Sequence, residues 1–298
     1  MGNFFKGLYR DRVSYLFILP FVVLFFVFTV LPVVISMGLS FTHFNMLEAP
    51  VFVGVDNYLR LFFNDPVFIQ AIRNTLIFAL IIGPVGYMLS LFVAWFINEL
   101  RPKLRAVITL IFYAPSISGN VFLIWAVMFS GDSQGYINGF LLRNHFIESP
   151  IQFLYNPDYM MFVVILVLLW LSLGVGFLAF IAGLQGIDRS YYEASAVDGI
   201  QNRWQELWYV TLPLMKPMLM FGAVMNIAGT FSIGPQITAL IPGFPSTDYA
   251  VHTIMHHLDD YGGMRFEMGY ASAIATLLFA MMIGANYLVK NLIKKVGD

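Results

Sequence analysis

Six long stretches of the chain contain no Asp, Glu, Lys or Arg, and apolar residues dominate each of them. They cover residues 13–47, 74–98, 106–131, 159–187, 217–247 and 268–289. A helix rises about 1.5 Å per residue and satisfies its own backbone, so about 20 apolar residues cross a hydrocarbon core of about 30 Å. The pattern predicts an all-α polytopic protein with six transmembrane helices, at about residues 14–40, 74–98, 106–130, 159–182, 214–237 and 268–290.

Composition agrees with a membrane protein. Of the 298 residues, 59% are hydrophobic and only 11% are charged, against about 25% charged in soluble domains. The net charge of −1 gives no basic excess for nucleic acid. There is no cysteine, which excludes disulfide scaffolds, thiolate metal sites and cysteine nucleophiles. The first stretch is longer than the apolar region of a signal peptide and contains Pro20 and Pro32, so we expect a retained helix.

Basic residues fix the expected orientation. With a cytoplasmic N-terminus, twelve Lys and Arg lie inside: Lys6, Arg10, Arg12, Arg101, Lys103, Arg105, Arg189, Arg203, Lys216, Lys290, Lys294 and Lys295. Four lie outside: Arg60, Arg73, Arg143 and Arg265. The positive-inside rule then places both termini in the cytoplasm. The external connections are too short for a further domain, so we expect one transmembrane domain over residues 1–298.

Few residues suggest chemistry of their own. His252, His256 and His257 precede Asp259 and Asp260, and an i, i+4 histidine pair can share a metal. The glutamate of an H-E-x-x-H helix is missing, so we expect solvated or interface residues and no metal site. A nucleophile elbow and a G-x-x-x-x-G-K-[ST] phosphate loop are also missing. We expect no catalytic residues and no cofactor in this chain.

Polar residues within two stretches suggest a solute pathway. They are Tyr113, Ser116, Ser118 and Asn120 in the third stretch, and Asn226, Thr230, Ser232 and Gln236 in the fifth. Their hydroxyl and amide groups can hydrogen-bond sugar hydroxyls, and Trp125 and Trp170 can stack on sugar rings. Glycines and prolines accompany them, including Gly83, Gly86, Gly174, Gly176, Gly222 and Gly229. The alternative is that these small residues serve helix packing and the tryptophans anchor the membrane interface.

One cytoplasmic loop, residues 186–216, is patterned as helix, turn, helix. Ser190 and Glu193 have the spacing of a capping box, Asp198 and Gly199 break the helix, and Asn202 with Gln205 begins a second one. We expect the second helix to direct Trp204, Leu207 and Trp208 toward apolar surroundings, with Pro213 and Pro217 bracketing re-entry into the membrane. The alternative is an amphipathic hairpin lying on lipid.

The same loop carries a family resemblance. Residues 193–200 read Glu-Ala-Ser-Ala-Val-Asp-Gly-Ile and precede Thr211-Leu212-Pro213 and Pro217. This resembles the EAA loop of binding-protein-dependent ABC importer permeases, although Ser195 and Ile200 replace small residues of the pattern. Two further blocks resemble the sugar-importer branch related to the maltose permease subunit MalF. They are Phe52-Val53-Gly54, Asn57-Tyr58, Leu61-Phe62, Asp65-Pro66, Phe68, Ala71 and Asn74-Thr75, and Ala182-Gly183-Leu184-Gln185.

The resemblance implies a compact six-helix permease with the type I, MetI-like fold, in a bacterial cytoplasmic membrane. It implies that the loop docks on an ATPase subunit through Glu193, Ala194, Ser195, Asp198, Gly199, Ile200 and Arg203. The implied partners are two ATPase subunits that bind ATP and Mg²⁺, a second, MalG-like permease in a heterodimer, and an extracytoplasmic binding protein that delivers a sugar. A permease for another solute and an ion-coupled carrier are the alternatives. The uncharged stretches argue against the carrier, since carriers usually keep ionisable groups in the membrane.

Overall fold

Helices make up most of the chain in the computed structural model, which describes residues 12–295. The strands in this described range form one hairpin, β1 (Thr42–His43) and β2 (Val51–Phe52). They pair antiparallel, with Thr42 opposite Phe52 and His43 opposite Val51. The predicted all-α architecture is confirmed.

Four helices are long and apolar enough to cross a membrane by themselves: Val13–Leu39, Pro66–Asn98, Pro157–Gln185 and Met268–Lys294. Two further helix pairs pass the same test together. Pro102–Ile117 and Val121–Met128 meet at an angle of 84°, and Arg203–Leu214 and Lys216–Phe231 meet at 80°. With each bent pair counted as one span, the number reaches the predicted six. The positions differ for the fifth span, because Arg203–Leu214 falls in the predicted loop 186–216, while the predicted range 214–237 contains the helix Lys216–Phe231 and most of the helix Gly234–Leu240.

The chain divides into two compact units. Unit 1 comprises residues 1–64 and 258–277, and unit 2 comprises residues 65–257 and 278–298. The described elements of unit 1 are α2 (Arg12–Phe25), η1 (Phe26–Val30), α3 (Leu31–Leu39), β1, β2, α4 (Asp56–Leu59), η2 (Arg60–Asn64), η5 (Asp260–Met264) and the start of α17 (Met268–Lys294).

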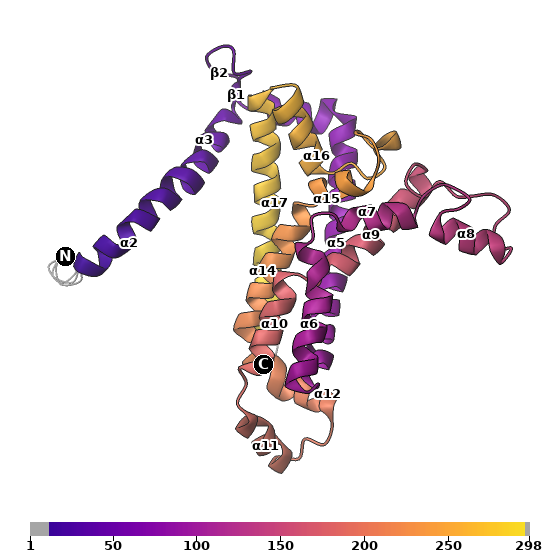
Figure 1. Cartoon of the computed structure of the whole chain (residues 1–298). Coiled ribbons are helices and arrows are strands. Elements are labelled where there is room, and N and C mark those ends of the chain that lie inside the picture. The colour runs from indigo at the N-terminus through magenta and orange to yellow at the C-terminus, as the bar shows by residue number, and fades with distance from the viewer. Residues whose placement is uncertain (1–11, 296–298) are drawn as a thin grey trace. The chain divides into compact units, whose positions relative to one another are not determined.

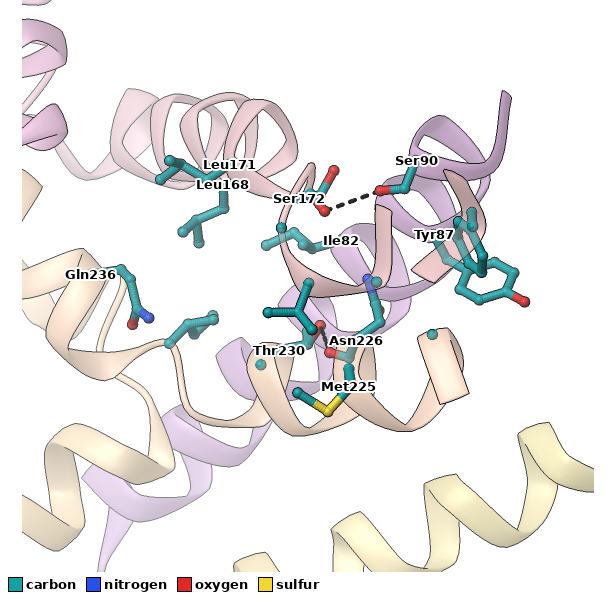
Figure 2. Close-up of a pocket in the computed structure, with 17 residues that line it drawn as sticks. Ile82, Tyr87, Ser90, Leu168, Leu171, Ser172, Met225, Asn226, Thr230 and Gln236 are labelled. Atoms are coloured by element: carbon teal, nitrogen blue, oxygen red, sulfur yellow. Dashed lines mark hydrogen bonds between the residues drawn. The ribbon is translucent and has the colours of Figure 1, made fainter. Parts of the chain in front are cut away.

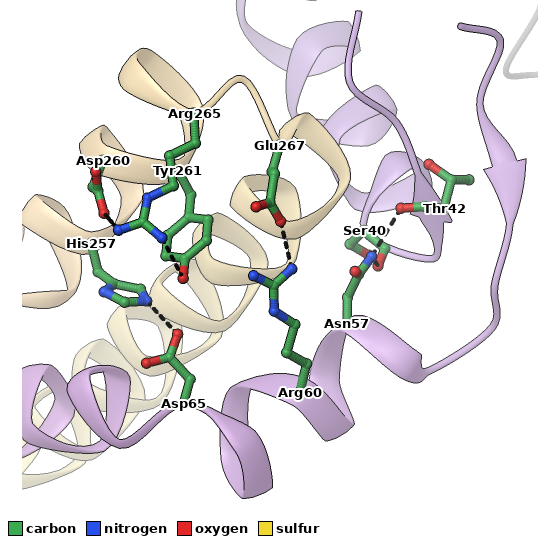
Figure 3. A network of polar contacts seen from close by, with 10 residues as sticks. All are labelled: Ser40, Thr42, Asn57, Arg60, Asp65, His257, Asp260, Tyr261, Arg265 and Glu267. Carbon is green, nitrogen blue, oxygen red and sulfur yellow. Dashed lines mark hydrogen bonds and ion pairs between the residues drawn. The ribbon is translucent and has the colours of Figure 1, made fainter.

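Polar contacts organise unit 1. The Asn57 side chain donates to the carbonyls of Ser40 and Thr42, both at 2.9 Å. Arg60 forms an ion pair with Glu267 (Figure 3), and its guanidinium lies 4.1 Å from the ring centroid of Tyr270. Asn57 belongs to the block that resembles sugar permeases, so in this unit the block has a structural role.

Unit 2 contains the larger set of helices. They are α5 (Pro66–Asn98), α6 (Pro102–Ile117), α7 (Val121–Met128), α8 (Tyr136–Arg143), α9 (Pro157–Leu171), α10 (Val175–Gln185), α11 (Arg189–Val197), α12 (Arg203–Glu206), η3 (Leu207–Thr211), α13 (Leu212–Leu214), α14 (Lys216–Phe231), α15 (Gly234–Leu240), η4 (Thr247–Tyr249), α16 (Ile254–Asp259, whose first residues belong here) and the end of α17.

Helices α5, α10 and α14 pack side by side as the centre of unit 2, with α6 beside α5 and α10 (Figure 1). Their common core contains Leu91, Phe177, Phe180, Met215 and Leu219. A second core joins α5, α9 and α15 through Phe78, Val163, Val167 and Ile237, among others. Both cores are apolar, as burial of one helix face requires.

Glycines allow the central helices to approach closely. A Cβ atom on Gly222 of α14 would lie 2.5 Å from the Phe180 ring of α10, and one on Gly86 of α5 would lie 2.8 Å from the Ser172 Cβ. A Cβ on Gly176 would lie 3.5 Å from the Gly222 carbonyl oxygen. These positions support the packing interpretation of the small residues.

Helix α5 begins earlier than the uncharged stretch at residue 74. Asp65 is its N-cap, and its carboxylate accepts from the Phe68 amide at 2.9 Å. Pro66 occupies the first helical position, where its missing amide hydrogen is not needed. The uncharged stretch therefore predicts only the part of α5 that can cross a membrane, whereas the N-cap at Asp65 defines where the helix begins.

Candidate functional site

A cavity of about 240 Å³ lies in unit 2 between α5, α14 and the break that separates α9 from α10. Figure 2 shows polar side chains from each of these elements around it: Tyr87 and Ser90, Asn226 and Thr230, and Ser172. Gly174, Gly176, Gly222 and Gly229 also line it. Within the described part of the chain, none of the lining residues is Asp, Glu, Lys, Arg or His. The cavity therefore offers uncharged hydrogen-bonding groups.

The hydroxyls of the cavity are held by backbone carbonyls. The Ser90 hydroxyl lies 2.8 Å from the Gly86 oxygen and 3.0 Å from the Ser172 oxygen. The Thr230 hydroxyl donates to Asn226 at 2.8 Å, and the Tyr87 hydroxyl donates to Leu219 at 3.1 Å. A hydroxyl that donates to the protein keeps its lone pairs for a ligand donor.

The predicted pathway residues fall into two groups. Asn226, Thr230 and Gln236 line the cavity, whereas Tyr113, Ser116 and Asn120 do not. Tyr113 packs against the core of α5, α10 and α14. Ser116 lies close to Gly174, at the edge of the lining set, and Asn120 is exposed at the bend between α6 and α7.

Trp125 and Trp170 lie against each other. Their ring centroids are 5.2 Å apart in an edge-to-face contact, and the Trp125 ring also packs on Phe129 at 5.9 Å. Neither tryptophan lines the cavity. In this structure they pack against neighbouring aromatic rings, away from the cavity.

The loop of residues 186–216 contains the predicted helix, turn and helix, with one correction. The N-cap of α11 is Asp188, whose carboxylate accepts from the Ser190 amide at 2.9 Å. The prediction that Ser190 caps this helix was wrong, and Glu193 pairs with Arg189 at 3.2 Å instead of reaching back. The helix ends where expected, at Asp198, and Gly199 has a φ of +92°. Only glycine adopts such a backbone freely.

The second half of the loop is tied to the membrane helices. Asn202 caps α12 as predicted, accepting from the Gln205 amide at 2.9 Å. Trp204 packs on Trp95 of α5 with ring centroids 5.1 Å apart, and Leu207 is buried. Trp204 and Trp208 are 61% and 58% exposed, and the expected apolar surroundings of Trp208 stay a prediction. The 80° bend before α14 falls between Pro213 and Pro217.

The predicted docking residues differ in their exposure. Glu193, Ala194, Asp198 and Gly199 are exposed, and Ile200 is half-buried. Ser195 is buried within the chain, and its hydroxyl donates to the Tyr192 carbonyl at 2.9 Å. The exposed face also includes two residues that the motif did not single out, Tyr191 and Val197, the latter 88% exposed.

Arg203 is paired within the chain. Its Nη2 lies 2.7 Å from Glu99 Oε2, at the end of α5, and its Nη1 lies 2.8 Å from Glu206 Oε2. Arg203 therefore joins α12 to the turn that follows α5.

The histidines correct another prediction. His252, His256 and His257 are buried, with at most 4% of each exposed, so they are not solvated. His257 Nε2 lies 2.9 Å from the Asp65 carboxylate, and His256 contacts Thr253 and Thr238. Burial lowers the pKa of His256 to about 4, and burial with the neighbouring His256 lowers that of His252 to about 3. Both rings are therefore neutral near pH 7.

These histidines belong to the segment of residues 249–257, which α5 holds in place. Asn74 donates to the carbonyls of Tyr249 at 3.0 Å and His252 at 2.9 Å, and the Thr75 hydroxyl accepts from the Ile254 amide at 3.0 Å. Among the residues that the structure describes, no group of three or more His, Asp or Glu is arranged to hold a metal ion. Asn74 and Thr75, part of the sugar-permease block, thus anchor this segment to α5.

Residues 86–298 match the family model described as binding-protein-dependent transport system inner membrane component. The match covers more than half of the chain. The chain belongs to this family. The permease is thus a multi-pass membrane component of an ABC importer, as the EAA-like sequence of residues 193–200 predicted.

Named relatives extend the match over nearly the whole permease. It is 33% identical to the probable ABC transporter permease protein YesP of Bacillus subtilis, over 93% of this chain and 89% of the relative. It is 28% identical to the lactose transport system permease protein LacF of Rhizobium radiobacter, over 94% and 93%. It is 29% identical to the arabinooligosaccharides transport system permease protein AraP of B. subtilis, over 92% and 86%.

A solved structure has the same fold. A chain of a bacterial alginate ABC transporter, in complex with alginate pentasaccharide-bound periplasmic protein, superposes on the permease with a TM-score of 0.74. Its sequence is 25% identical, and the similarity covers 97% of the permease and 98% of that chain.

Sequence reasoning missed the cavity residues of α5 and of the α9–α10 break. Tyr87, Ser90 and Ser172 are isolated polar residues in apolar stretches, with no neighbouring polar group in sequence. The break itself was signalled by Gly174 and Gly176. A search for polar residues within one helical turn of a glycine would have found Tyr87 and Ser90, near Gly86, and Ser172, near Gly174.

Proposed function

We propose that the permease imports an uncharged sugar or oligosaccharide, delivered by an extracytoplasmic binding protein. The observation that carries this proposal is the cavity, whose polar lining consists of hydroxyl and amide groups from Tyr87, Ser90, Ser172, Asn226, Thr230 and Gln236. Such groups complement sugar hydroxyls, which both donate and accept hydrogen bonds. The names of LacF and AraP, which refer to lactose and arabinooligosaccharides, support the same solute class.

The residues that line the cavity favour a neutral solute over an acidic one. An acidic sugar carries carboxylates, and burying one away from water requires a paired cation. The lining residues of the described cavity include no Lys, Arg or His. We therefore expect a neutral sugar, although one structural neighbour belongs to an alginate transporter.

The energy comes from partner subunits in this proposal. Two ATPase subunits bind ATP and Mg²⁺, and a second, MalG-like permease completes a heterodimer, because one coupling loop per chain serves one ATPase. This chain contributes no cofactor and no catalytic residue. The exposed face of α11, with Glu193, Ala194, Val197 and Asp198, is the docking surface that the proposal assigns to the ATPase.

Both termini and the coupling loop lie in the cytoplasm of a bacterium. The twelve inner against four outer basic residues support this orientation. ATP binding draws the two ATPase subunits together and moves α11. The attachment of α12 to α5 through Trp204 and Arg203 carries the motion to the central helices. The bundle then turns from inward-open to outward-open as a rigid body.

Transport by the reconstituted complex tests the proposal. Proteoliposomes containing both permeases, the ATPases and the binding protein are loaded with ATP, and uptake of labelled neutral sugars, uronates and amino acids is compared. We expect uptake of a neutral sugar. Uptake restricted to uronates or amino acids would overturn the assignment of the solute while leaving the family intact.

Variants of the cavity test its role. Asn226→Ala removes a side chain that can make two or more hydrogen bonds to the solute, each worth about 1 kcal/mol, so uptake should fall about fivefold or more. ATPase activity stimulated by the binding protein should persist. Asn120→Ala is the matched control, since Asn120 is exposed and does not line the cavity. An equal loss of sugar uptake in Asn226→Ala and Asn120→Ala would contradict the proposal that the cavity lies on the solute pathway.

A further inference from the structure

An aromatic patch lies on the outer connection between the third and fourth spans. It consists of Tyr136 and Phe140 of α8 and Phe146, which follows the helix. Of these residues 70%, 57% and 69% are exposed, and the rings of Phe140 and Phe146 lie 6.5 Å apart. Large aromatic side chains that face outward together mark an interaction surface.

The opposite face of α8 is fixed to unit 2. Ile137 and Leu141 pack against the core that α5, α9 and α15 share. Asn138 is fully buried, donates to the carbonyls of Ser130 and Ile151, and accepts from the Ile151 amide, each at 2.9 Å. The helix is therefore amphipathic and held in one orientation, so the patch is presented by a rigid support.

The connection places α8 close to the bilayer. It begins after α7, which ends at Met128, and it ends at α9, which begins at Pro157. Both helices belong to predicted spans, and α8 contacts α7 and lies beyond its end in Figure 1. Seven residues separate α7 from α8 and thirteen separate α8 from α9. Connections of this length keep α8 near the ends of the two spans, at the level of the lipid headgroups.

A cation accompanies the patch. Arg143 is three residues after Phe140, so the two side chains share a face of α8. Its Nε donates to the Gly139 carbonyl at 2.9 Å, and in the described part of the chain it makes no ion pair with a carboxylate. Aromatic rings together with an arginine are the side chains that proteins place at the headgroup layer.

We propose that α8 is an interfacial helix whose aromatic patch inserts into the outer leaflet of the bilayer, with Arg143 bound to lipid phosphate. Lipid is the occupant that the geometry favours, because the patch combines aromatic rings and a cation at the end of two spans. The contact fixes the depth of the outer ends of α7 and α9. Since α9 leads to Ser172, it also steadies one wall of the cavity.

Spin labelling of the complete transporter tests this contact. The chain has no cysteine, so Phe140→Cys gives one labelling site in this subunit, and Glu148→Cys gives a control on an exposed charged position of the same connection. Both are paired with cysteine-free partner subunits and placed in vesicles of phosphatidylethanolamine and phosphatidylglycerol. Collisions of each nitroxide with oxygen, which concentrates in lipid, and with a water-soluble nickel chelate are measured with and without the binding protein.

The label at residue 140 should collide with oxygen and lose access to nickel, while the label at residue 148 should show the reverse. Equal nickel access at the two positions, with and without the binding protein, would overturn the proposal. Nickel access at residue 140 that disappears only when the binding protein is added would also overturn it, in favour of a protein contact. Because Arg143 binds phosphate in this account, Arg143→Gln should move the residue 140 label toward water.

Discussion

Arg203 shows how one residue acquires a different role once its neighbours are known. The motif places it in the docking loop, whereas its guanidinium bridges Glu99 and Glu206. One of these carboxylates lies on its own helix and the other at the end of α5. Of the two ion pairs, only the one with Glu99 connects the loop of residues 186–216 to α5, so mutation of Glu206 is a matched control for mutation of Glu99.

We expect Glu99→Gln to reduce the sugar imported per ATP hydrolysed by about two- to fivefold, since an exposed ion pair contributes at most about 1 kcal/mol. Glu206→Gln removes the pair within α12 and should leave this ratio nearly unchanged. The ratio is measured in proteoliposomes from the same complex. An unchanged ratio in Glu99→Gln would show that the Arg203–Glu99 ion pair does not couple ATP hydrolysis to sugar transport.

The buried histidines make stability depend on pH. The folded pKa values of His252 and His256, about 3 and about 4, lie below the ordinary value of 6.5. Between these values the unfolded chain binds more protons than the folded one, so the free energy of unfolding falls as the pH falls from about 6.5 toward 4. Above 6.5 their contribution is constant.

His252→Phe should therefore weaken this pH dependence. The melting temperature of the purified protein is compared at pH 7.5 and pH 5. We expect the difference to be smaller in His252→Phe than in the parent protein, because one of the two groups that must stay neutral is gone. His145→Phe, at an exposed position, should keep the parental difference. The same difference in all three proteins would contradict the neutral, buried state of His252.

Residue roles were predictable where the contact is local. The cap at Asn202 and the turn at Gly199 depend on a few neighbouring residues, and both were predicted correctly. At the start of α11 two adjacent candidates, Asp188 and Ser190, compete, and a spacing rule does not decide between them. Burial of His252 depends on α5, which is distant in sequence, so the local pattern wrongly suggested a solvated residue.

Helices α10 and α14 pack closely along Gly222, and adding a single methyl group at this position tests that contact. Gly222→Ala places a Cβ 2.5 Å from the Phe180 ring, and such overpacking destabilises by about 1–3 kcal/mol. Gly284→Ala in α17 is the control, because nothing lies within 4 Å of its Cβ position. Thermal unfolding in detergent should show a lower melting temperature for Gly222→Ala alone. Equal melting temperatures would contradict the close approach.

The helices were predictable where a long uncharged stretch of sequence indicates a membrane span. Each predicted span corresponds to one long helix or to two successive helices, which for residues 214–237 are α14 and α15, since a bilayer leaves few alternatives. The bends were not predictable in size. Pro115 and Gly119 mark the place where α6 gives way to α7, but the angle of 84° depends on the helices that receive α7. This bend leaves Asn120 outside the cavity, although it lies in a candidate stretch.

At the scale of the molecule, the family was predictable and the cavity was half predictable. The loop from Glu193 to Pro217 is continuous in sequence, so its pattern survives without a structure. The cavity combines α5, α14 and the α9–α10 break, and only the α14 residues and nearby Gln236 were among the candidates. Single serines in apolar helices become recognisable when packing brings Ser90 next to Ser172.

The central claim is that the permease moves a sugar with energy from partner ATPases. ATP-dependent sugar uptake into proteoliposomes tests it most directly, with the complete complex compared with complexes lacking the ATPases or carrying Gly199→Val in the coupling loop. The φ of +92° at Gly199 strains valine by about 1–2 kcal/mol or more, so this variant should assemble and lose uptake. The account predicts uptake only with ATP, ATPases and binding protein together. Uptake that persists without the ATPases, or that follows an ion gradient, would contradict it.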